Sequence, residues 1–405
     1  MFPNPHLSNF NHSQFSQLWL LDKTVTFLNH GSFGACPLPT LQVQQQLREK
    51  LEQEPVHFFI REWEPLIKQS RQTLATFLGT SPDQLVFIPN ATTGVNAVLR
   101  SLPFAAGDEL LTTNQEYNAC RNVLDFVAHN SGASIVTAPI PFPLDSPEAV
   151  IEAVLNAVSP RTRLALLDHV VSQTALVFPI PRLVQELAAR GVDTLVDGSH
   201  APGMIPLNLT EIGAAYYVGN CHKWLCAPKG VGFLNVRLDL QDKIRPPVIS
   251  HGANSPRTDV SRFHLEFDWM GTDDPTAYLS IPAALELMAS RVPGGWQGLM
   301  DHNHQLALAA RNLLCETLAI APPCPDDMVG AMASIPLPPH LILPIAPSGI
   351  PVLQEKLWEQ YQIEVPVIPW LNSSQHLLRI SAQIYNNISQ YEFLAQALQN
   401  FSEKF

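Results

Sequence analysis

Two neighbouring stretches carry most of the information about this chain: Leu195-Val196-Asp197-Gly198-Ser199-His200 and Tyr216-Tyr217-Val218-Gly219-Asn220-Cys221-His222-Lys223-Trp224. Each begins with an apolar run typical of a buried strand and ends in polar groups, among them the carboxylate of Asp197 and the amine of Lys223. In open α/β sheets, ligands lie beyond the carboxyl ends of the strands. We therefore expect Asp197 and Lys223 to share one site.

A buried carboxylate beside an amine is what a pyridoxal phosphate site requires. Asp197 would pair with the ring nitrogen of the coenzyme, and Lys223 would form a Schiff base with its aldehyde. Burial lowers the pKa of a lysine, so Lys223 is also suited to move the α-proton of an amino acid. His200 would hydrogen-bond the phenolic oxygen of the coenzyme. Taken singly, these residues could be a turn aspartate, a surface lysine and a structural histidine; their pairing favours the coenzyme.

The surrounding sequence predicts an α/β fold. Apolar runs alternate with helical patterns, and the runs fall at 85–88, 109–111, 134–136, 164–167, 194–196, 216–218 and 231–234. This alternation predicts a mostly parallel seven-stranded sheet with helices on both faces. Two helical patterns precede it, at 40–54 and 65–78, with Pro55 expected to end the first.

The pattern changes after Pro275 to two long helical stretches, at 276–289 and 297–319. Strand patterns at 330–336, 363–367 and 377–382 follow, with helices at 352–361 and 390–400, which predicts a small α+β domain. We expect an N-terminal segment (1–28) that packs with the small domain, a large coenzyme-binding domain (29–275), and a final unit of connecting helices and small domain (276–405).

Composition indicates a globular enzyme, with 405 residues, 46% hydrophobic content and a net charge of −12 without a basic cluster. We expect neither a nucleic acid nor a membrane as partner, because no apolar stretch is long enough to span a bilayer. The six scattered cysteines favour free thiols and a cytoplasmic location. No HExxH motif occurs, and we expect no metal site.

Three further places fit the coenzyme hypothesis. Ala91, Thr92 and Thr93 open a helix directly after a strand, where backbone amides would cradle a phosphate; ordinary N-capping by threonine is the alternative. The ring of Tyr117 would stack on the coenzyme, unless it is a core tyrosine. Arg379 is a charge inside an apolar strand, which a bidentate contact with a substrate carboxylate would explain, or else a structural salt bridge.

Five motifs, in order, resemble those of the class V aminotransferase family and its isopenicillin N epimerase-like branch: 27–34 (Phe-Leu-Asn-His-Gly-Ser-Phe-Gly), 90–93, 197–203, 219–224 and 379–381. The resemblance implies the fold-type I architecture of pyridoxal phosphate enzymes. It also implies a homodimer whose active sites lie at the subunit interface, with Thr272 reaching the phosphate of the partner subunit. By the same resemblance, Ser172, Gln173 and His222 would lie beside the coenzyme, and Asn29 and His30 would line the substrate pocket.

The chain departs from relatives at two places. Many carry an arginine after the Gly-Thr pair, whereas this chain has Asp273, which leaves the substrate open. Cysteine desulfurases place a nucleophilic cysteine before the small-domain arginine, and none lies between Glu364 and Arg379. Persulfide chemistry is therefore disfavoured.

These observations lead to a hypothesis of a coenzyme-dependent enzyme that acts at the α-carbon of a small amino acid substrate. Epimerisation, with Tyr117 as a second proton donor, ranks first. Elimination by a C–S lyase ranks second and transamination third. A binding protein that keeps the fold without activity is the non-enzymatic alternative, and the joint presence of Asp197, His200, Lys223 and Arg379 argues against it.

Overall fold

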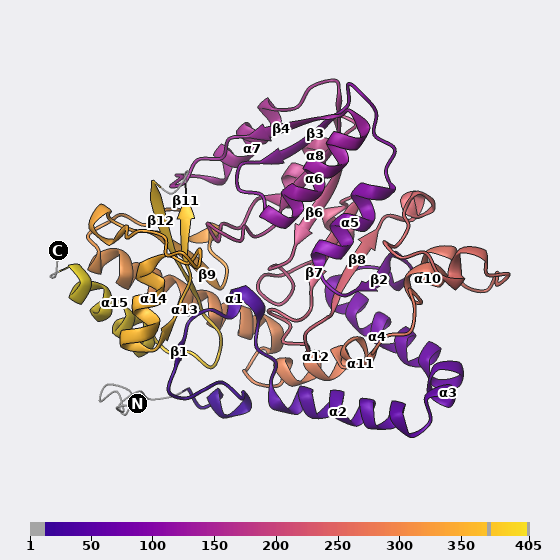
Figure 1. The fold of residues 1–405 in the computed structure, drawn as a ribbon, viewed down its shortest axis with the longest axis horizontal. Helices are drawn as coiled ribbons and strands as arrows, with labels where there is room; N and C mark the ends of the chain where they lie inside the picture. The colour runs from indigo at the N-terminus through magenta and orange to yellow at the C-terminus, as the bar shows by residue number, and fades with distance from the viewer. Residues whose placement is uncertain (1–12, 371–373, 403–405) are drawn as a thin grey trace.

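The computed structural model describes residues 13–370 and 374–402. Figure 1 shows a large sheet on one side of the molecule and a small sheet on the other, with the short helix α1 (His30–Phe33) between them. The large sheet has seven strands in the order β2-β8-β7-β6-β5-β3-β4, all parallel except β8, which runs antiparallel to both neighbours. The predicted mostly parallel seven-stranded sheet is thus confirmed.

The strands of the large sheet are short apolar runs, and most are buried along their whole length, as a sheet covered on both faces requires. Their bounds are β2 (Leu85–Ile88), β3 (Glu109–Thr113), β4 (Ser134–Ala138), β5 (Thr162–Asp168), β6 (Asp193–Gly198), β7 (Tyr216–Asn220) and β8 (Gly232–Val236).

Helices cover both faces of this sheet. Apolar side chains of α5 (Ala91–Ser101), α6 (Asn118–Ser131) and α10 (Arg262–Phe267) pack on one face. The other face is covered by a second group of helices, together with the short α9 (Leu209–Ile212): α4 (Trp63–Leu78), α7 (Pro147–Asn156), α8 (Ile180–Ala188), α11 (Thr276–Leu279) and α12 (Ile281–Ala289).

Two prolines shape the N-terminal helices. The first predicted helix ends before Pro55 as expected, since α2 covers Leu38–Gln53. Pro55 then begins the separate short helix α3 (Pro55–His57), because a proline is tolerated in the first turn. A π-helical turn over 58–62 then leads into α4. Because Pro65 has no N–H, the carbonyl of Arg61 loses its usual i+4 donor, which suits a local change of hydrogen-bond register.

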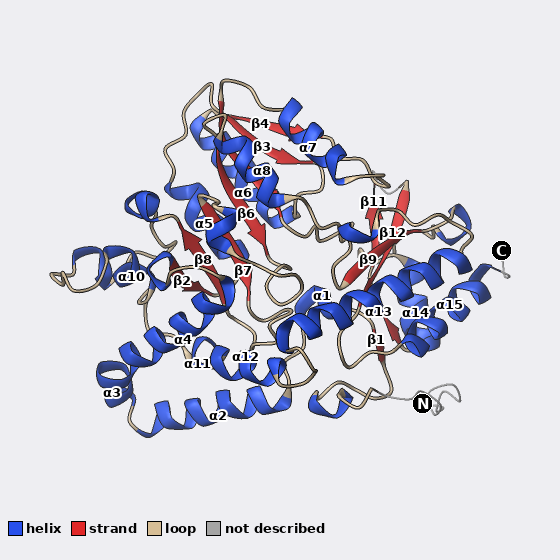
Figure 2. Cartoon of the chain, turned by 180° about the vertical axis from the view of Figure 1, so that it is seen from behind, coloured by secondary structure: helices blue, strands red, loops and turns tan. Residues whose placement is uncertain are grey.

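The small sheet is antiparallel and has the order β11 (Val367–Trp370), β12 (Gln375–Ser381) and β9 (Met332–Pro336). The continuous strand expected over 363–367 is wrong, because β10 (Ile363–Glu364) ends before Pro366, which cannot donate to a ladder. Figure 2 shows the long α13 (Gly295–Thr317) beside this sheet, with α14 (Val352–Tyr361) and α15 (Ile388–Ser402) nearby.

The described part of the N-terminal segment contacts the small sheet region. β1 (Thr26–Phe27) pairs in parallel with β10, and the rings of Trp19 and Tyr385 lie 5.0 Å apart. Residues 1–12 lie outside the described residues. The division into 1–28, 29–275 and 276–405 stays a proposal.

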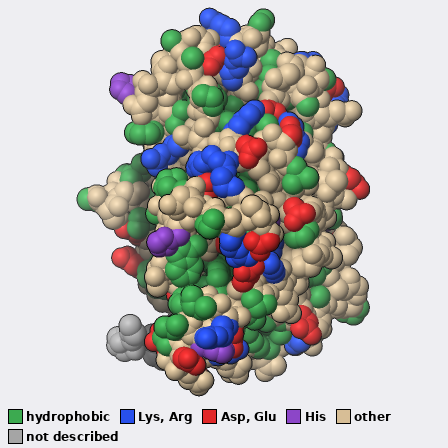
Figure 3. Space-filling model, turned by 90° about the vertical axis from the view of Figure 1, so that its right-hand side faces the viewer, with side chains coloured by type: hydrophobic (Ala, Val, Ile, Leu, Met, Phe, Trp, Pro, Cys, Tyr) green, Lys and Arg blue, Asp and Glu red, His purple; other side chains and the backbone are tan. Residues whose placement is uncertain are grey.

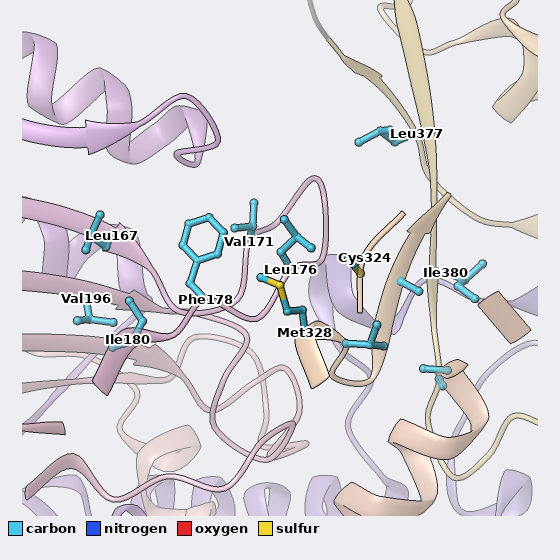
Figure 4. Packing of buried hydrophobic residues seen from close by; sticks show 14 of the residues in the cluster. Leu167, Val171, Leu176, Phe178, Ile180, Val196, Cys324, Met328, Leu377 and Ile380 are labelled. Carbon is cyan, nitrogen blue, oxygen red and sulfur yellow. The ribbon is translucent and has the colours of Figure 1, made fainter. Parts of the chain in front are cut away.

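One hydrophobic cluster joins the two sheets. Figure 4 shows Leu167 and Val196 of the large sheet at one end, Leu176 and Met328 in the middle, and Leu377 and Ile380 of β12 at the other end. In the middle of this cluster, Val177 N also donates a backbone hydrogen bond of 2.8 Å to Met328 O. The ends of the central strands are thereby held against β12, which carries Arg379. No helix in the described residues is long and apolar enough to cross a membrane.

Candidate active site

Adjacent parallel strands deliver the two groups on which the coenzyme hypothesis depends. Asp197 lies near the carboxyl end of β6 and pairs with Val218 of β7, and the turn that follows β7 carries Lys223. Asp197 is buried, with 2% of its surface exposed. Lys223 is partly exposed as a residue, but its amine lies deep, and burial is the main reason that its pKa falls from 10.5 to about 7. The charge of Arg379 lowers the pKa further.

His200 contacts the Lys223 amine directly, with Nε2 3.1 Å from Nζ. The indole N–H of Trp224 donates to Nδ1 of the same ring at 3.5 Å. Because an indole can only donate, Nδ1 accepts, and in a neutral imidazole the proton must then lie on Nε2. Burial and the charge of Lys223 hold the pKa of His200 well below its ordinary value, so the ring is neutral. His200 therefore donates to Lys223 and supports the uncharged, nucleophilic amine.

Two residues, Ser199 and Cys120, supply three hydrogen-bond donors to Asp197. Its Oδ1 accepts from the backbone N–H of Ser199 at 2.9 Å and from the Ser199 hydroxyl at 2.5 Å. Its Oδ2 accepts from the thiol of Cys120 at 3.3 Å. These donors fix the orientation of the carboxylate.

Two further buried carboxyl groups, Glu116 and Asp168, interact with Asp197. Burial raises the pKa of both well above the ordinary range, and the charge of Asp197 raises each further. One oxygen of each, Oε1 and Oδ2 respectively, has no hydrogen-bond partner among the described residues. Burial thus disfavours the charged forms of Glu116 and Asp168. The ligand atoms of Glu116, Cys120 and Asp197 lie within 4.8 Å of one another, and the Cys120 thiol donates to Asp197 within this group.

The N-terminus of α5 forms a small cradle beside β7. Asn220 Oδ1 accepts from Ala91 N at 2.9 Å, and Asn90, rather than a threonine, caps Thr93 N at 2.9 Å. Thr92 is half-buried between them, and its backbone N–H has no partner in the described part of the chain. An amide and hydroxyl at a helix N-terminus suit a phosphate group.

Gly94 brings this cradle close to the sheet. A Cβ at Gly94 would lie 2.6 Å from side-chain atoms of both Ile88 and Val218, so only glycine lets α5 approach β7 this closely. The cradle therefore lies near the turn that carries Lys223.

Arg379 lies on β12 and reaches the site from the small sheet. Its Nη1 donates to Ser172 O at 2.5 Å and its Nη2 to the Ser32 hydroxyl at 2.8 Å. Its Nε is buried and has no partner among the described residues. Burial lowers the pKa of Arg379 to about 10, which the nearby phenol of Tyr117 partly offsets. No carboxylate neutralises this guanidinium in the described structure, so it is available to an anionic ligand.

Gln173 and Ser172, which were also predicted to lie at the coenzyme, are found beside Arg379 and β9. Gln173 O accepts from Ser334 at 2.6 Å, and the buried Gln173 Oε1 has no partner among the described residues. Tyr117, at the N-terminus of α6, is 43% exposed and is not a core tyrosine.

The other residues predicted for the site either contact protein groups or are exposed to solvent. His222 Nδ1 donates to Val231 O at 2.9 Å, and burial lowers the pKa of His222 to about 4. Both ring nitrogens of the buried His30 contact other protein groups. Asn29 is buried beside Arg379. Thr272 is exposed.

The sequence analysis missed four residues at the site: Ser32, Glu116, Cys120 and Asp168. Asp168 could have been found, since it ends a buried apolar strand in the same way as Asp197. The other three carry no local signal, because only the packing of α1 and α6 brings them to Arg379 and Asp197.

The donor set fits pyridoxal phosphate. Asp197 would hold the ring nitrogen, Lys223 the aldehyde carbon, and the N-terminus of α5 the phosphate. Two buried atoms here, Arg379 Nε and Gln173 Oε1, lack partners among the described residues. A bound group with polar substituents would satisfy them.

Comparisons with known proteins agree with this geometry. The family model for aminotransferase class-V matches residues 39–321. Isopenicillin N epimerase of Amycolatopsis lactamdurans is 36% identical over 95% of this chain and 96% of its own length. A putative L-cysteine desulfhydrase of Oryza sativa subsp. japonica is 28% identical over 92% of this chain and 82% of its own length.

The fold has solved counterparts. The cystine C–S lyase C-DES, solved with its product cysteine persulfide, superposes with a TM-score of 0.75 at 23% identity, covering 92% of this chain and 97% of its own. The epimerase relative and the family model together span the large sheet, the Lys223 turn and, for the relative, nearly the whole chain. The chain therefore belongs to the class V aminotransferases and is a fold-type I, pyridoxal phosphate-dependent enzyme.

Proposed function

We propose that this enzyme is an amino acid epimerase, in which Lys223 removes the α-proton and a second group returns a proton to the opposite face. The observation that carries the proposal is the buried pair of Lys223, with its pKa near 7, and Arg379, with its unpartnered Nε. A base whose pKa lies near neutral, together with a guanidinium that has one unpartnered N–H, suits removal of a proton from a substrate that carries a carboxylate. The 36% identity to isopenicillin N epimerase supports the same chemistry.

Arg379 would bind the substrate carboxylate. Ser32 and Ser172 accept from its outer nitrogens and leave the Nε–H without a protein acceptor. A carboxylate oxygen would satisfy that donor and offset the cost of burying the charge. Binding would thereby fix the Cα–H bond relative to Lys223.

Lys223 would act as the base at Cα. When bound, the coenzyme supplies an electron sink for the pair of electrons left at that carbon. Asp197, fixed by Ser199 and Cys120, would keep the ring nitrogen protonated. His200 would donate to the Lys223 amine while that amine is free of the aldehyde and acts as the base.

Tyr117 would be the second proton donor. It is the exposed tyrosine at this site, lies at the N-terminus of α6, and is close enough to Arg379 for their charges to interact. A donor on the face opposite Lys223 is the one requirement of epimerisation that the Lys223–Arg379 pair does not supply.

A C–S lyase is the second candidate, because L-cysteine desulfhydrases are 28% identical over most of the chain. Elimination uses the same base and needs a leaving group on the β-carbon in place of a second donor. Persulfide chemistry on the enzyme remains disfavoured, since the sequence has no cysteine between Glu364 and Arg379.

We propose further that the enzyme is a cytoplasmic homodimer, with Thr272 completing the phosphate site of the partner subunit. All six cysteines are free thiols, which fits a reducing compartment. Figure 3 shows the side that carries α3, α4 and α10, where hydrophobic groups lie between charged ones. Ile60 and Leu238, 75% and 58% exposed, border a hollow of about 660 Å³ there, which suits a protein partner. Light scattering on the purified protein would measure the subunit number.

The experiment that tests the function is incubation of the coenzyme-loaded enzyme with single L- and D-amino acids in deuterated water. Epimerisation predicts α-deuterium in both enantiomers of one amino acid. Release of a keto acid, ammonia and a thiol from a cysteine derivative would support the lyase instead. Tyr117→Phe should abolish racemisation but spare elimination.

A further inference from the structure

The segment Asn29–Gly34, singled out in the sequence, lies between the two halves of the site. It contains α1, which Figure 1 places between the large and small sheets. The sequence alone suggested that Asn29 and His30 face the substrate. The contacts of the segment connect it both to the Lys223 turn and to Arg379.

His30 holds the backbone of Lys223. Its Nε2 lies 3.1 Å from the Lys223 carbonyl and its Nδ1 2.8 Å from the hydroxyl of Tyr385. Because a carbonyl only accepts, Nε2 must donate, and Nδ1 then accepts from Tyr385. Burial lowers the pKa of His30 to about 3, so the ring keeps this single neutral arrangement.

Gly34 brings the segment against the same turn. Its φ is +69°, and a Cβ there would overlap the carbonyl oxygen of His222 and lie 2.8 Å from Lys223 Cα. Any other residue at Gly34 would push the Lys223 backbone away. The turn is closed by a 2.7 Å hydrogen bond from Gly34 N to His30 O, so the two contacts form one unit.

The middle of the segment holds Arg379. The Ser32 hydroxyl donates to Asn29 Oδ1 at 2.5 Å, which leaves its lone pairs to accept from Arg379 Nη2 at 2.8 Å. Asn29 is fixed in turn by its amide, which donates to Glu364 at 3.0 Å. Gly31 N donates to the Ser381 hydroxyl, two residues beyond Arg379 on β12, at 3.0 Å.

We propose that Asn29–Gly34 is a positioning clamp that sets the spacing between the Lys223 base and the Arg379 carboxylate site. The inference rests on the proposed function and deepens it. One short segment contacts both groups, with His30 and Gly34 on the Lys223 turn and Ser32 on Arg379. A substrate bound by Arg379 is thereby positioned relative to Lys223, and a change in one set of contacts affects the other.

The test compares Ser32→Ala, Tyr385→Phe and the double variant in the coenzyme-loaded enzyme. Ser32→Ala loses a hydrogen bond to a charged group, so KM for the amino acid should rise about tenfold or more, with the absorbance of bound coenzyme unchanged. Tyr385→Phe frees the His30 ring, so it should lower kcat and shift the pH at which that absorbance titrates, with little change in KM. Because one segment makes both sets of contacts, the loss of kcat/KM in the double variant should be smaller than the product of the two single losses.

Matched controls separate positioning from general destabilisation. Ser70 and Tyr216 are buried residues of the predicted large domain, where Ser70 donates to Tyr278 O. Ser70→Ala and Tyr216→Phe should leave KM and the absorbance titration as in the wild type. Ser32→Thr, which retains the hydroxyl, should recover most of the lost affinity even if Ser32→Ala folds poorly.

Three results would overturn the clamp: clamp variants that behave like the controls, fully multiplicative losses in the double variant, or Ser32→Thr as impaired as Ser32→Ala. Failure of the proposed function has a different signature. In that case the wild-type enzyme itself would bind the coenzyme without exchanging any α-proton.

Discussion

The lowered pKa of Lys223 predicts a pH-dependent cost to the folded apoenzyme. Burial brings the pKa from 10.5 to about 7, and at roughly 1.4 kcal/mol per pKa unit the difference amounts to at most about 5 kcal/mol. The cost is fully present below pH 7, where folding must bury a charged amine or release its proton. This cost falls as the pH rises from 7 towards 10.5. Over that range the lysine of the unfolded chain increasingly loses its own proton, so folding no longer has to remove it.

Lys223→Met keeps most of the apolar stem and removes the amine. The variant apoenzyme should therefore be more stable than the wild type by about 4 kcal/mol at pH 7 and by only about 2 kcal/mol at pH 9. Urea unfolding of both apoenzymes at fixed protein concentration, from pH 6 to pH 10, measures this difference. Comparing the pair at each pH cancels the contributions of all other groups.

Lys243 provides the control, because it is exposed. Lys243→Met should change stability by less than about 0.5 kcal/mol at any of these pH values. A stability difference between Lys223→Met and the wild type that stays constant from pH 7 to pH 9 would refute the assignment of a neutral, buried amine.

Three other substitutions test the remaining parts of the site. Asp197→Asn removes a charged partner of the ring nitrogen, so α-proton exchange should fall roughly 10- to 150-fold while the coenzyme's phosphate contacts persist, as measured by exchange rates and coenzyme titration. Arg379→Lys replaces the guanidinium fork with a point charge, so KM should rise on the order of tenfold with a smaller change in kcat, seen in steady-state kinetics. Glu116→Gln mimics the protonated carboxyl. Because the pKa of Glu116 is raised in the folded protein, the wild type loses stability as the pH rises above about 4.5, and the variant should become increasingly more stable than the wild type. Urea unfolding measures this difference, and the opposite trend would contradict a raised pKa of Glu116.

Much of the fold could be predicted from the sequence because local patterns and tertiary structure agree there. Apolar runs bounded by polar residues became the strands of the large sheet, and the helix expected at 352–361 has those bounds. The strand expected over 363–367 failed because Pro366 lies where a ladder donor is required.

The site was predictable where chemistry follows a strand end. Asp197, Lys223 and the α5 N-terminus were named on that ground, and the structure brings them to one edge of the sheet. The sequence could not show which side chains form hydrogen bonds with one another. The Cys120 thiol reaches Asp197 across 77 residues of sequence, and Ser32 reaches Arg379 across 347. Such pairings depend on packing between elements and leave no local pattern.

The central claim is that Lys223 is the base at the α-carbon of an amino acid held by Arg379. Single-turnover α-deuterium exchange in deuterated water, followed for the wild type and Lys223→Ala with added coenzyme, tests it most directly. We predict exchange in the wild type and a loss of at least about a hundredfold in the variant. Exchange at the wild-type rate in Lys223→Ala would contradict the account.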